Sequence, residues 1–526
     1  MKKIYIYDTT LRDGAQTEGI SYSVQDKINI AERLDDFGIS YIEGGWPYSN
    51  LKDKEFFDYF KKHPLKKSTL VPFGSTHHPA NPAYKDKNLI SLIKAETEFV
   101  TIFGKSWDLH VREVLKINPD ANLKIIYDSV RFLSKKGRKV FYDAEHFFDG
   151  YKINKNYALQ TVKAALEAGC DLVVLCDTNG GSLSWEIKHI ARELRSALSI
   201  ENFGIHCHND LGLGVINSII TVEDGCNHIQ GTINGYGERC GNADLIPIIG
   251  ILQLKLKYQA IPPKKLEGLV ELSRYVSEVS NMIHRDNQPF VGRSAFAHKG
   301  GIHIDAVLKN PFAYEHIKPN LVGNKRRFLI SELAGKSSLV IKAKELEYEL
   351  DKKSLQAKKL HKLLQNLEKE GYQFEAAEGS FKLLLEKAFK KYKKFFDLLG
   401  FRVIVEKRED KRLISEAAIK LKIKGKLEHT AAEGDGPVNA LDNALRKALE
   451  KFYPTLAKMH LTDFKVRVLD AASGTAAKVR VLIESQDDKE SWSTIGVSEN
   501  IIEASYDALV DSIEYKLLKG YRKHNL

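Results

Sequence analysis

The strongest chemical signal in the chain is a pair of histidines, His206 and His208, separated by Cys207. The pair ends a short apolar run at residues 204–208, which favours a β-strand. Side chains on a strand alternate between its two faces, so both imidazoles would point the same way while Cys207 points into the opposite layer. Two imidazoles on one face can ligate a divalent metal ion. Taken alone, such a pair is more often two hydrogen-bonded histidines than a metal site.

Oxygen ligands for the same ion would come from two other places in the sequence. Asp13 stands beside Arg12 in a polar turn that follows the strand-like residues 4–7. Asn242 lies in the segment after the last strand-like run, at residues 228–233. Two nitrogens and two oxygens, with positions left for water or substrate, favour Mg²⁺, Mn²⁺, Co²⁺ or Zn²⁺. The predicted metal site therefore consists of Asp13, His206, His208 and Asn242.

The elements needed to bring these residues together recur through the first half of the chain. Short apolar runs stand at residues 4–7, 41–44, 69–73, 99–103, 139–143, 172–176, 204–208 and 228–233. Helical patterns separate most of the runs; Ser23, for example, can cap a helix that ends at Gly38. Alternating strands and helices predict a parallel sheet, and eight such units predict an α/β fold of the closed (β/α)₈ TIM-barrel type. An open, doubly wound sheet is the alternative.

Residues able to do chemistry follow these runs, as a barrel predicts, because active sites on this fold lie where strands end and loops begin. Besides the four predicted metal ligands, these residues are Arg12, Glu43, Asp143, Glu145, Asp177, Thr178, Asn179, Asn209 and Asp210. In a closed barrel the first and seventh strands are near neighbours, so Asp13 can approach the histidine pair. The clustering favours one active site over a set of unrelated surface residues.

The composition narrows the class of protein. At 526 residues the chain is long enough for two to four domains. No apolar run reaches the roughly 20 residues that span a bilayer. The five cysteines include no Cys-x-x-Cys pair, which favours reduced thiols, and we expect a cytoplasmic protein. The net charge of +11 allows a nucleic-acid partner, but the sequence lacks the clustered arginines with interleaved aromatic residues that such a protein would carry.

Three further regions follow the predicted barrel. The first two have helical patterns, and the later of them is expected to act as a linker. The last contains two strand-like stretches, at 417–424 and 476–483, each followed by a helical one. This internal repeat predicts a pseudo-symmetric α+β domain. The predicted domains are residues 1–260, 261–335, 336–396 and 397–526.

Several motifs, found in order along most of the chain, give it a resemblance to the Claisen-condensing acyltransferases of the 2-isopropylmalate, homocitrate and citramalate synthase family. The motifs are Asp8-Thr-Thr-Leu-Arg-Asp-Gly14, His206-Cys-His-Asn-Asp210, Gly237-Glu-Arg-Cys-Gly-Asn242 and His298-Lys-Gly-Gly-Ile-His-Ile-Asp305. Two further segments, Ala15-Gln-Thr-Glu-Gly19 and Glu43-Gly-Gly-Trp-Pro-Tyr-Ser-Asn50, resemble the long citramalate synthases within that family. A 2-isopropylmalate synthase would more often have an acidic residue at position 15.

The resemblance implies a metal-dependent condensation of acetyl-CoA, the co-substrate, with pyruvate, followed by hydrolysis of the thioester. The residues that it implies for catalysis are Arg12, Glu145, His303 and Tyr314, and those for substrate binding are Arg12, Gln16 and Thr178. Arg12 would stabilise the developing alkoxide, and Glu145 would act as the base or orient it. His303 and Tyr314 would reach a catalytic site, often that of the neighbouring subunit. The sequence does not identify the residues that bind CoA.

By the same resemblance, residues 397–526 form a regulatory domain that binds an end-product amino acid, isoleucine, and helps to form a homodimer or a higher homo-oligomer. A dimerisation domain without an effector is the alternative. A sibling enzyme, 2-isopropylmalate or homocitrate synthase, would use the same site with a different keto acid. The remote alternative is a non-enzymatic, basic protein that binds nucleic acid.

Overall fold

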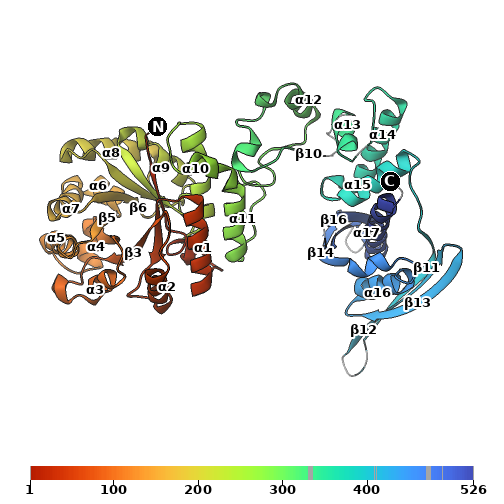
Figure 1. Ribbon diagram of the computed structural model, residues 1–526, viewed down its shortest axis with the longest axis horizontal. Coiled ribbons are helices and arrows are strands. Elements are labelled where there is room, and N and C mark those ends of the chain that lie inside the picture. The colour runs from red at the N-terminus through yellow and green to blue at the C-terminus, as the bar shows by residue number, and fades with distance from the viewer. Residues whose placement is uncertain are drawn as a thin grey trace. The chain divides into compact units, whose positions relative to one another are not determined.

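The computed structural model describes residues 2–329, 336–346, 348–407, 409, 412–469, 476–488 and 490–524 (Figure 1). The chain divides into two compact units. The first unit holds Met1–Phe296 and Ile317–Arg326, and the second holds Ala297–His316 and Arg327–Leu526. The four domains predicted from the sequence stay a prediction, and one of their boundaries, after residue 335, falls outside the described residues.

Eight parallel strands close into a barrel in the first unit and follow one another in the order of the sequence. They are β1 (Tyr5–Asp8), β2 (Tyr41–Gly45), β3 (Thr69–Ser75), β4 (Phe99–Lys105), β5 (Lys139–Glu145), β6 (Leu172–Asp177), β7 (Phe203–Cys207) and β8 (Cys226–Gly231). The last strand returns to the first, where Tyr5 pairs with His228 and Asp8 with Gly231. The predicted barrel is therefore confirmed, and the open doubly wound sheet is wrong.

Helices connect successive strands of the barrel. They are α1 (Val24–Phe37), α2 (Leu51–Lys62), α3 (Lys87–Lys94), α4 (Asp108–Glu113), α5 (Pro119–Lys135), α6 (Phe147–Ile153), α7 (Lys155–Ala168), α8 (Ser184–Leu198) and α9 (Gly214–Ile219), followed by α10 (Leu245–Leu254) and α11 (Leu269–Val279). Ser23 caps α1 as predicted, since its hydroxyl accepts from the amide of Asp26 while the Asp26 carboxylate accepts from the amide of Ser23. Gly38 ends the helix in the left-handed region, at a φ of 95°.

Aromatic rings pack inside the barrel, because alternate residues of each strand point inward. Tyr7 and Phe141 meet edge to face with ring centroids 6.0 Å apart, and Phe99 stacks on Phe141 at 4.9 Å. His228 packs against Phe141 at 4.9 Å, and burial lowers its pKa to about 3, so it is a neutral packing residue. The interior is therefore filled, and the carboxyl ends of the strands are left to form a site.

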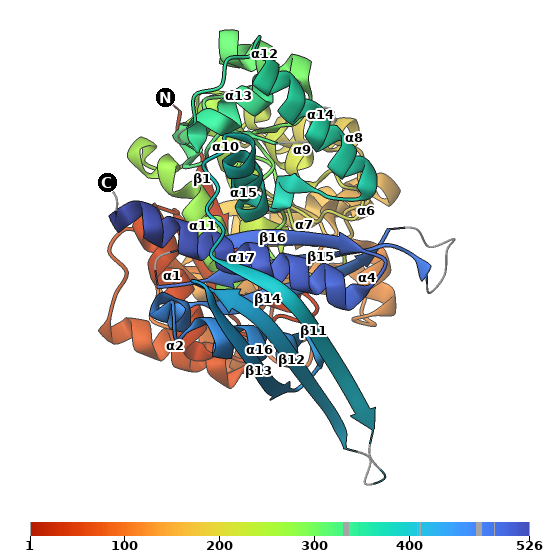
Figure 2. The same cartoon turned by 90° about the vertical axis from the view of Figure 1, so that its right-hand side faces the viewer.

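The second unit begins with short helices and ends with two sheets (Figure 2). Its helices before the sheets are α12 (Gly301–Lys309), α13 (Lys336–Glu345), α14 (Leu355–Glu370) and α15 (Glu378–Ala388), and β9 (Ala297–His298) pairs with β10 (Arg327–Phe328). Among the described residues, no helix is long and apolar enough to cross a membrane. A cytoplasmic location stays a prediction.

Two copies of one arrangement form the end of the second unit: three antiparallel strands followed by a helix. The copies consist of β11 (Phe396–Lys407), β12 (Leu413–Ile423), β13 (Lys426–Gly434) and α16 (Pro437–Leu449), and of β14 (His460–Val468), β15 (Val479–Gln486), β16 (Ser491–Ser498) and α17 (Ile501–His524). Thr430 donates to the carbonyl of Ala444 at 3.0 Å, and Thr494 donates to that of Ala508 at 2.7 Å. Each bond joins the last strand of a copy to the helix that follows it. The two copies can therefore be aligned with Thr430 opposite Thr494 and Ala444 opposite Ala508.

Candidate metal centre and active site

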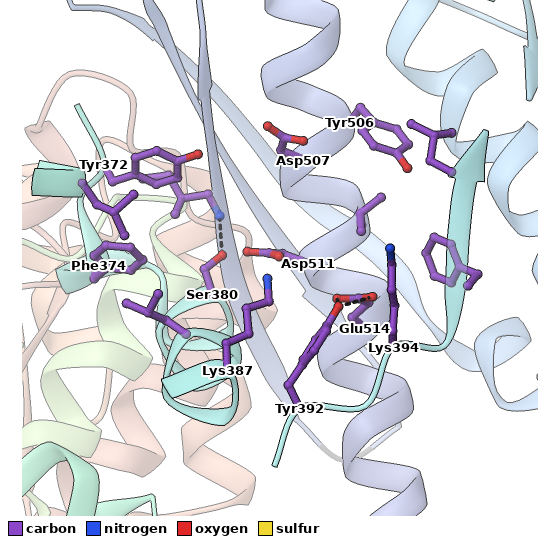
Figure 3. Close-up of a pocket in the computed structure, with 16 residues that line it drawn as sticks. Tyr372, Phe374, Ser380, Lys387, Tyr392, Lys394, Tyr506, Asp507, Asp511 and Glu514 are labelled. Carbon is purple, nitrogen blue, oxygen red and sulfur yellow. Dashed lines mark hydrogen bonds between the residues drawn. The ribbon is translucent and has the colours of Figure 1, made fainter. Parts of the chain in front are cut away.

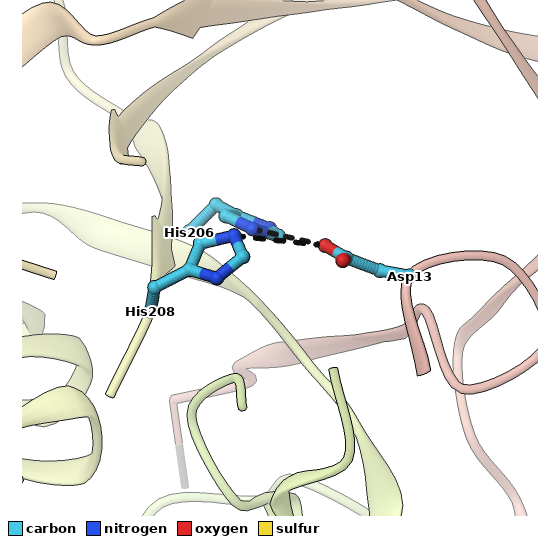
Figure 4. Close-up of side chains that lie close together, drawn as sticks. All are labelled: Asp13, His206 and His208. Atoms are coloured by element: carbon cyan, nitrogen blue, oxygen red, sulfur yellow. Dashed lines mark ion pairs between the residues drawn. The ribbon is translucent and has the colours of Figure 1, made fainter. Parts of the chain in front are cut away.

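Asp13, His206 and His208 converge at the carboxyl ends of the barrel strands (Figure 4). His206 lies on β7, His208 follows that strand, and Asp13 lies in the turn after β1. The Oδ2 atom of Asp13 is 3.4 Å from Nε2 of His206 and 3.8 Å from Nε2 of His208. One ligand atom from each residue lies within 4.8 Å of the others, and all three side chains are buried. These distances allow the three residues to share one ion.

Asn242 is held beside this group by the backbone. It forms an isolated antiparallel bridge with His208, and its Nδ2 donates to the carbonyl of Tyr236 at 3.3 Å. That bond turns the amide so that Oδ1 remains available. Among the described residues, buried Oδ1 of Asn242 and buried Oδ1 of Asp13 have no hydrogen-bond partner. Buried acceptors without donors are costly, and a cation would satisfy them, so the residues fit a divalent metal ion.

The charge states of the three side chains suit a cation. Burial alone would raise the pKa of Asp13, but Arg12 and the two histidines outweigh it and hold the pKa well below its usual range. Burial lowers the pKa of His208 to about 4, and His206 adds to this effect. Burial would also lower the pKa of His206, but Asp13 outweighs it and raises that pKa. At neutral pH the group thus offers a carboxylate, a neutral imidazole and an imidazole whose proton a metal ion would displace.

Arg12 contacts both Glu43 and the Asp13 oxygen that faces the histidines. Its Nε donates to Oε1 of Glu43 at 2.6 Å, and its Nη1 lies 3.7 Å from Oδ2 of Asp13. The guanidinium carbon sits 3.8 Å from the centre of the Phe73 ring. Burial would lower the pKa of Arg12, but Glu43 and Asp13 outweigh it and raise that pKa. The guanidinium is therefore a fixed positive charge close to the candidate metal ligands.

Glu43 is itself anchored inside the barrel. The hydroxyl of Tyr7 donates to its Oε2 at 2.6 Å and lies 2.7 Å from Oγ1 of Thr101. The sequence places Glu43 at a strand end but carries no signal for its hydrogen bond with Arg12. Nor was Gln230 on β8, which contacts His206, among the predicted residues. Gln230 could have been found from the alternation of side chains along a strand, because it stands two residues after His228 and so shares the inward face of β8.

The other predicted residues of the barrel lie at strand ends with distinct partners. Glu145 ends β5 and forms an ion pair with Lys105, its neighbour in the register of β4 and β5. Thr178 follows β6, and its hydroxyl accepts from the amide of His146 at 2.8 Å. Gln16 is exposed at the end of the turn that begins beside Asp13. Their roles in binding and catalysis stay predictions.

His303 and Tyr314 belong to the second unit. His303 lies on α12, and its ring packs on that of Tyr314 with centroids 4.3 Å apart and planes at 31°. Both side chains are exposed, Tyr314 by 48 %. The structure thus pairs these two residues with each other, and their catalytic role stays a prediction.

Three family models match the chain in succession. The model described as HMGL-like matches residues 3–276, the homocitrate synthase post-HMGL domain-like model matches residues 290–370, and the LeuA allosteric (dimerisation) domain model matches residues 375–517. The first covers the barrel with its metal centre. The last covers α15 and both copies of the strand–helix arrangement, as far as residue 517 in α17.

Curated relatives match nearly the whole chain. An (R)-citramalate synthase from Aquifex aeolicus is 55% identical over 519 residues, which cover 98% of each protein. The (R)-citramalate synthase from Geobacter sulfurreducens is 53% identical, over 99% of this chain and 98% of that protein. The 2-isopropylmalate synthase from Methanocaldococcus jannaschii is 30% identical, over 98% of this chain and 95% of that protein.

Proposed function

The chain belongs to the HMGL-like family and, within it, to the (R)-citramalate synthases, and we propose that it condenses acetyl-CoA with pyruvate and hydrolyses the resulting thioester to (R)-citramalate. It is an acyltransferase of isoleucine biosynthesis in this proposal. The observation that carries it is the buried group of Asp13, His206 and His208, in a chain that matches citramalate synthases from end to end. The higher identity to these relatives than to a 2-isopropylmalate synthase supports pyruvate as the keto acid.

Asp13, His206, His208 and Asn242 would hold the metal ion, and Mg²⁺, Mn²⁺, Co²⁺ and Zn²⁺ all suit this mixture of nitrogen and oxygen ligands. When bound, the ion would supply Lewis acidity to the ketone of pyruvate. The support for this assignment is chemical, because two buried oxygens in the group, Oδ1 of Asp13 and Oδ1 of Asn242, have no donor among the residues that the structure describes.

Arg12 would stabilise the alkoxide that develops on the ketone oxygen as the new carbon–carbon bond forms. Its guanidinium is held by Glu43 at 2.6 Å and keeps its charge, so it needs little reorganisation as negative charge appears. Thr178 and Gln16 would bind the carboxylate of pyruvate. Thr178 suits this role because it lies at the strand end next to β7, which carries His206.

Glu145 would take the proton from the methyl group of acetyl-CoA, or orient the group that takes it. Its ion pair with Lys105 fixes the carboxylate at the end of β5. Glu145 also shares the inward side of that strand with Asp143, because the two are separated by one residue. His303 and Tyr314 would reach a catalytic site, often that of the neighbouring subunit, and their mutual stacking supports a joint role.

The LeuA allosteric (dimerisation) domain supports an effector and a homodimer. Isoleucine is the effector that we propose, since the end product of a pathway commonly inhibits an enzyme that acts early in it. A higher homo-oligomer is compatible with the same domain.

The experiment that tests the function is a thiol-release assay with acetyl-CoA and a panel of keto acids. We expect CoA release to be fastest with pyruvate and to stop when a chelator removes the metal. A preference for 2-oxoisovalerate or 2-oxoglutarate would replace the proposal by 2-isopropylmalate or homocitrate synthesis. Absence of CoA release with every keto acid, in a protein loaded with Mn²⁺, would contradict all three.

A further inference from the structure

A cavity of about 420 Å³ lies in the second unit, between the linker helices and the last helix, α17 (Figure 3). The side of the cavity formed by α14, α15 and the turn between them carries Tyr372 and Phe374. Phe396 of β11 and Tyr506 of α17 add two more aromatic rings. The cavity is therefore large enough for a small organic molecule, and aromatic, aliphatic and charged side chains all line it.

One face of α17 presents carboxylates to this cavity. Asp507, Asp511 and Glu514 lie four and three residues apart, which places them on the same side of the helix. Two lysines also line the cavity, Lys387 and Lys394. Lys394 is already paired with Asp397, at 2.7 Å. Of the two ammonium groups, only that of Lys387 is then left to balance the three carboxylates. The lining therefore has an excess of acidic groups.

The three carboxylates differ in the hydrogen bonds and ion pairs that the protein gives them. Glu514 accepts from the hydroxyl of Tyr392, at 2.6 and 2.7 Å, and Asp511 is hydrogen-bonded to Ser380. Within the described part of the chain, Asp507 has no hydrogen bond or ion pair. The Nζ atom of Lys387 likewise has no ion pair there and sits 4.9 Å from the centre of the Tyr392 ring. In Figure 3 the ammonium group of Lys387 points toward Asp511, and Asp507 lies one turn further along α17.

Burial makes this negative charge costly. It raises the pKa of Asp507 to about 6, with Asp511 and Glu503 adding to the effect, and it raises the pKa of Glu514 to about 7. It also raises the pKa of Asp511. A carboxylate in such surroundings is stabilised by a cation at hydrogen-bonding distance.

The repeat shows that the fold itself does not require Asp507 and Asp511. The matching bonds of Thr430 and Thr494 align Ala444 with Ala508, so Asn443 corresponds to Asp507 and Lys447 to Asp511. The first copy therefore carries an amide and a lysine where the second carries two carboxylates, whereas Glu514 matches an acid, Glu450. Since both helices follow their sheets in the same way, the fold does not explain Asp507 and Asp511.

We propose that this cavity binds a small organic amine, with its ammonium group between Asp507 and Asp511 and its apolar or aromatic body among the rings of Tyr372, Phe374 and Phe396. A metal ion does not suit the site, because among the described residues only Asp13, His206 and His208 form a group of metal-ligating side chains. Aromatic rings also favour an organic cation, since their faces attract positive charge. Such a site is independent of the condensation chemistry in the barrel.

Isothermal titration of the full-length protein with three probes that share a phenyl ring tests this proposal. The probes are 2-phenylethylamine, phenylalanine and 3-phenylpropionate, which are a cation, a zwitterion and an anion at neutral pH. We expect the amine to bind at least ~10-fold more tightly than phenylalanine, and the anion not to bind. Asp507→Asn and Asp511→Asn should each weaken binding of the amine at least ~10-fold.

Asp488→Asn is the matched control, because Asp488 is an exposed acid of the same unit that pairs with Lys458 at 3.0 Å. Its affinity for the amine should equal that of the unsubstituted protein, and circular dichroism should show all three variants folded. The proposal is overturned if the amine does not bind, if the three probes bind equally, or if amine binding survives both substitutions at Asp507 and Asp511.

Discussion

Gln230 connects His206 to Asp143 inside the barrel. Its Oε1 lies 2.9 Å from Nδ1 of His206, and its Nε2 donates to Oδ1 of Asp143 at 3.1 Å. An amide oxygen only accepts, so Nδ1 of His206 carries the hydrogen of this bond. In the neutral imidazole the lone pair is then at Nε2, the atom that lies 3.4 Å from Asp13. Gln230 thereby selects the tautomer that a metal ion needs.

Gln230→Ala should weaken metal binding about 10- to 100-fold, because His206 loses the acceptor that fixes its ring and tautomer. Titration calorimetry with Mn²⁺ measures the change. Gln25→Ala is a suitable control, since Gln25 is exposed and bonds only Asn29 among the described residues, at 2.8 Å. Equal Mn²⁺ affinity in the Gln230 variant and the control would show that the contact has no positioning role.

His206→Ala should abolish both metal binding and turnover, because it removes one of the three ligands that lie within 4.8 Å of one another. Bound metal can be counted after dialysis, and turnover by CoA release. His189→Ala, which changes a side chain that is 70% exposed, should leave both unchanged. Turnover by a metal-free His206 variant would reject the ligand assignment.

Arg12→Lys should lower kcat about 10²- to 10³-fold while Mn²⁺ still binds. A lysine keeps the charge, but it cannot hold Glu43 through Nε and present a second nitrogen to the reacting oxygen. Steady-state kinetics with pyruvate and a parallel Mn²⁺ titration separate the two effects. Arg33→Lys, at a surface ion pair with Glu271, serves as the control. A normal kcat in the Arg12 variant would exclude the proposed role in alkoxide stabilisation.

Metal affinity should fall as the pH falls, and the pKa of His206 sets the pH below which it does so. Its pKa is raised above the ordinary value of 6.5, whereas that of His208 is lowered to about 4 and Asp13 stays ionised. Below the raised pKa, His206 must lose one proton before it can ligate, so affinity should drop about tenfold per pH unit. Above that pKa the affinity should level off.

Calorimetry in buffers of different ionisation enthalpy counts the protons released on Mn²⁺ binding. About one proton per ion is expected below the pKa of His206, and close to none well above it. The His208 pKa of about 4 predicts no second proton at pH 6. Release of two protons at pH 6, or of none at any pH from 5.5 to 8, would contradict these charge states.

The barrel was predictable because its signals are local. Each strand is a short apolar run, and Ser23 and Gly38 mark the ends of α1 with side-chain and backbone chemistry that depends on few neighbours. The apolar pattern at residues 216–222 resembles one continuous helix, but the structure interrupts it. That stretch divides into α9 and a turn at Val222–Asp224, and Gly225 ends the turn at a φ of 106°.

The group of Asp13, His206 and His208 was predictable because barrel strands end at one rim. The contacts of Gln230 with His206, and of Glu43 with Arg12, were not, since they depend on the register of neighbouring strands and on side-chain direction. The cavity beside α17 could not be predicted from the sequence for a similar reason. Tyr392 and Glu514 meet there across 122 positions of the chain, and no periodic pattern signals such a meeting.

The most direct test of the metal centre is anomalous diffraction from crystals of the full-length protein grown with Mn²⁺. We predict one strong manganese peak per chain, bounded by Asp13, His206 and His208, with Oδ1 of Asn242 turned toward it. A peak at any other place in the chain, or none at these three side chains in the presence of millimolar Mn²⁺, would contradict the account.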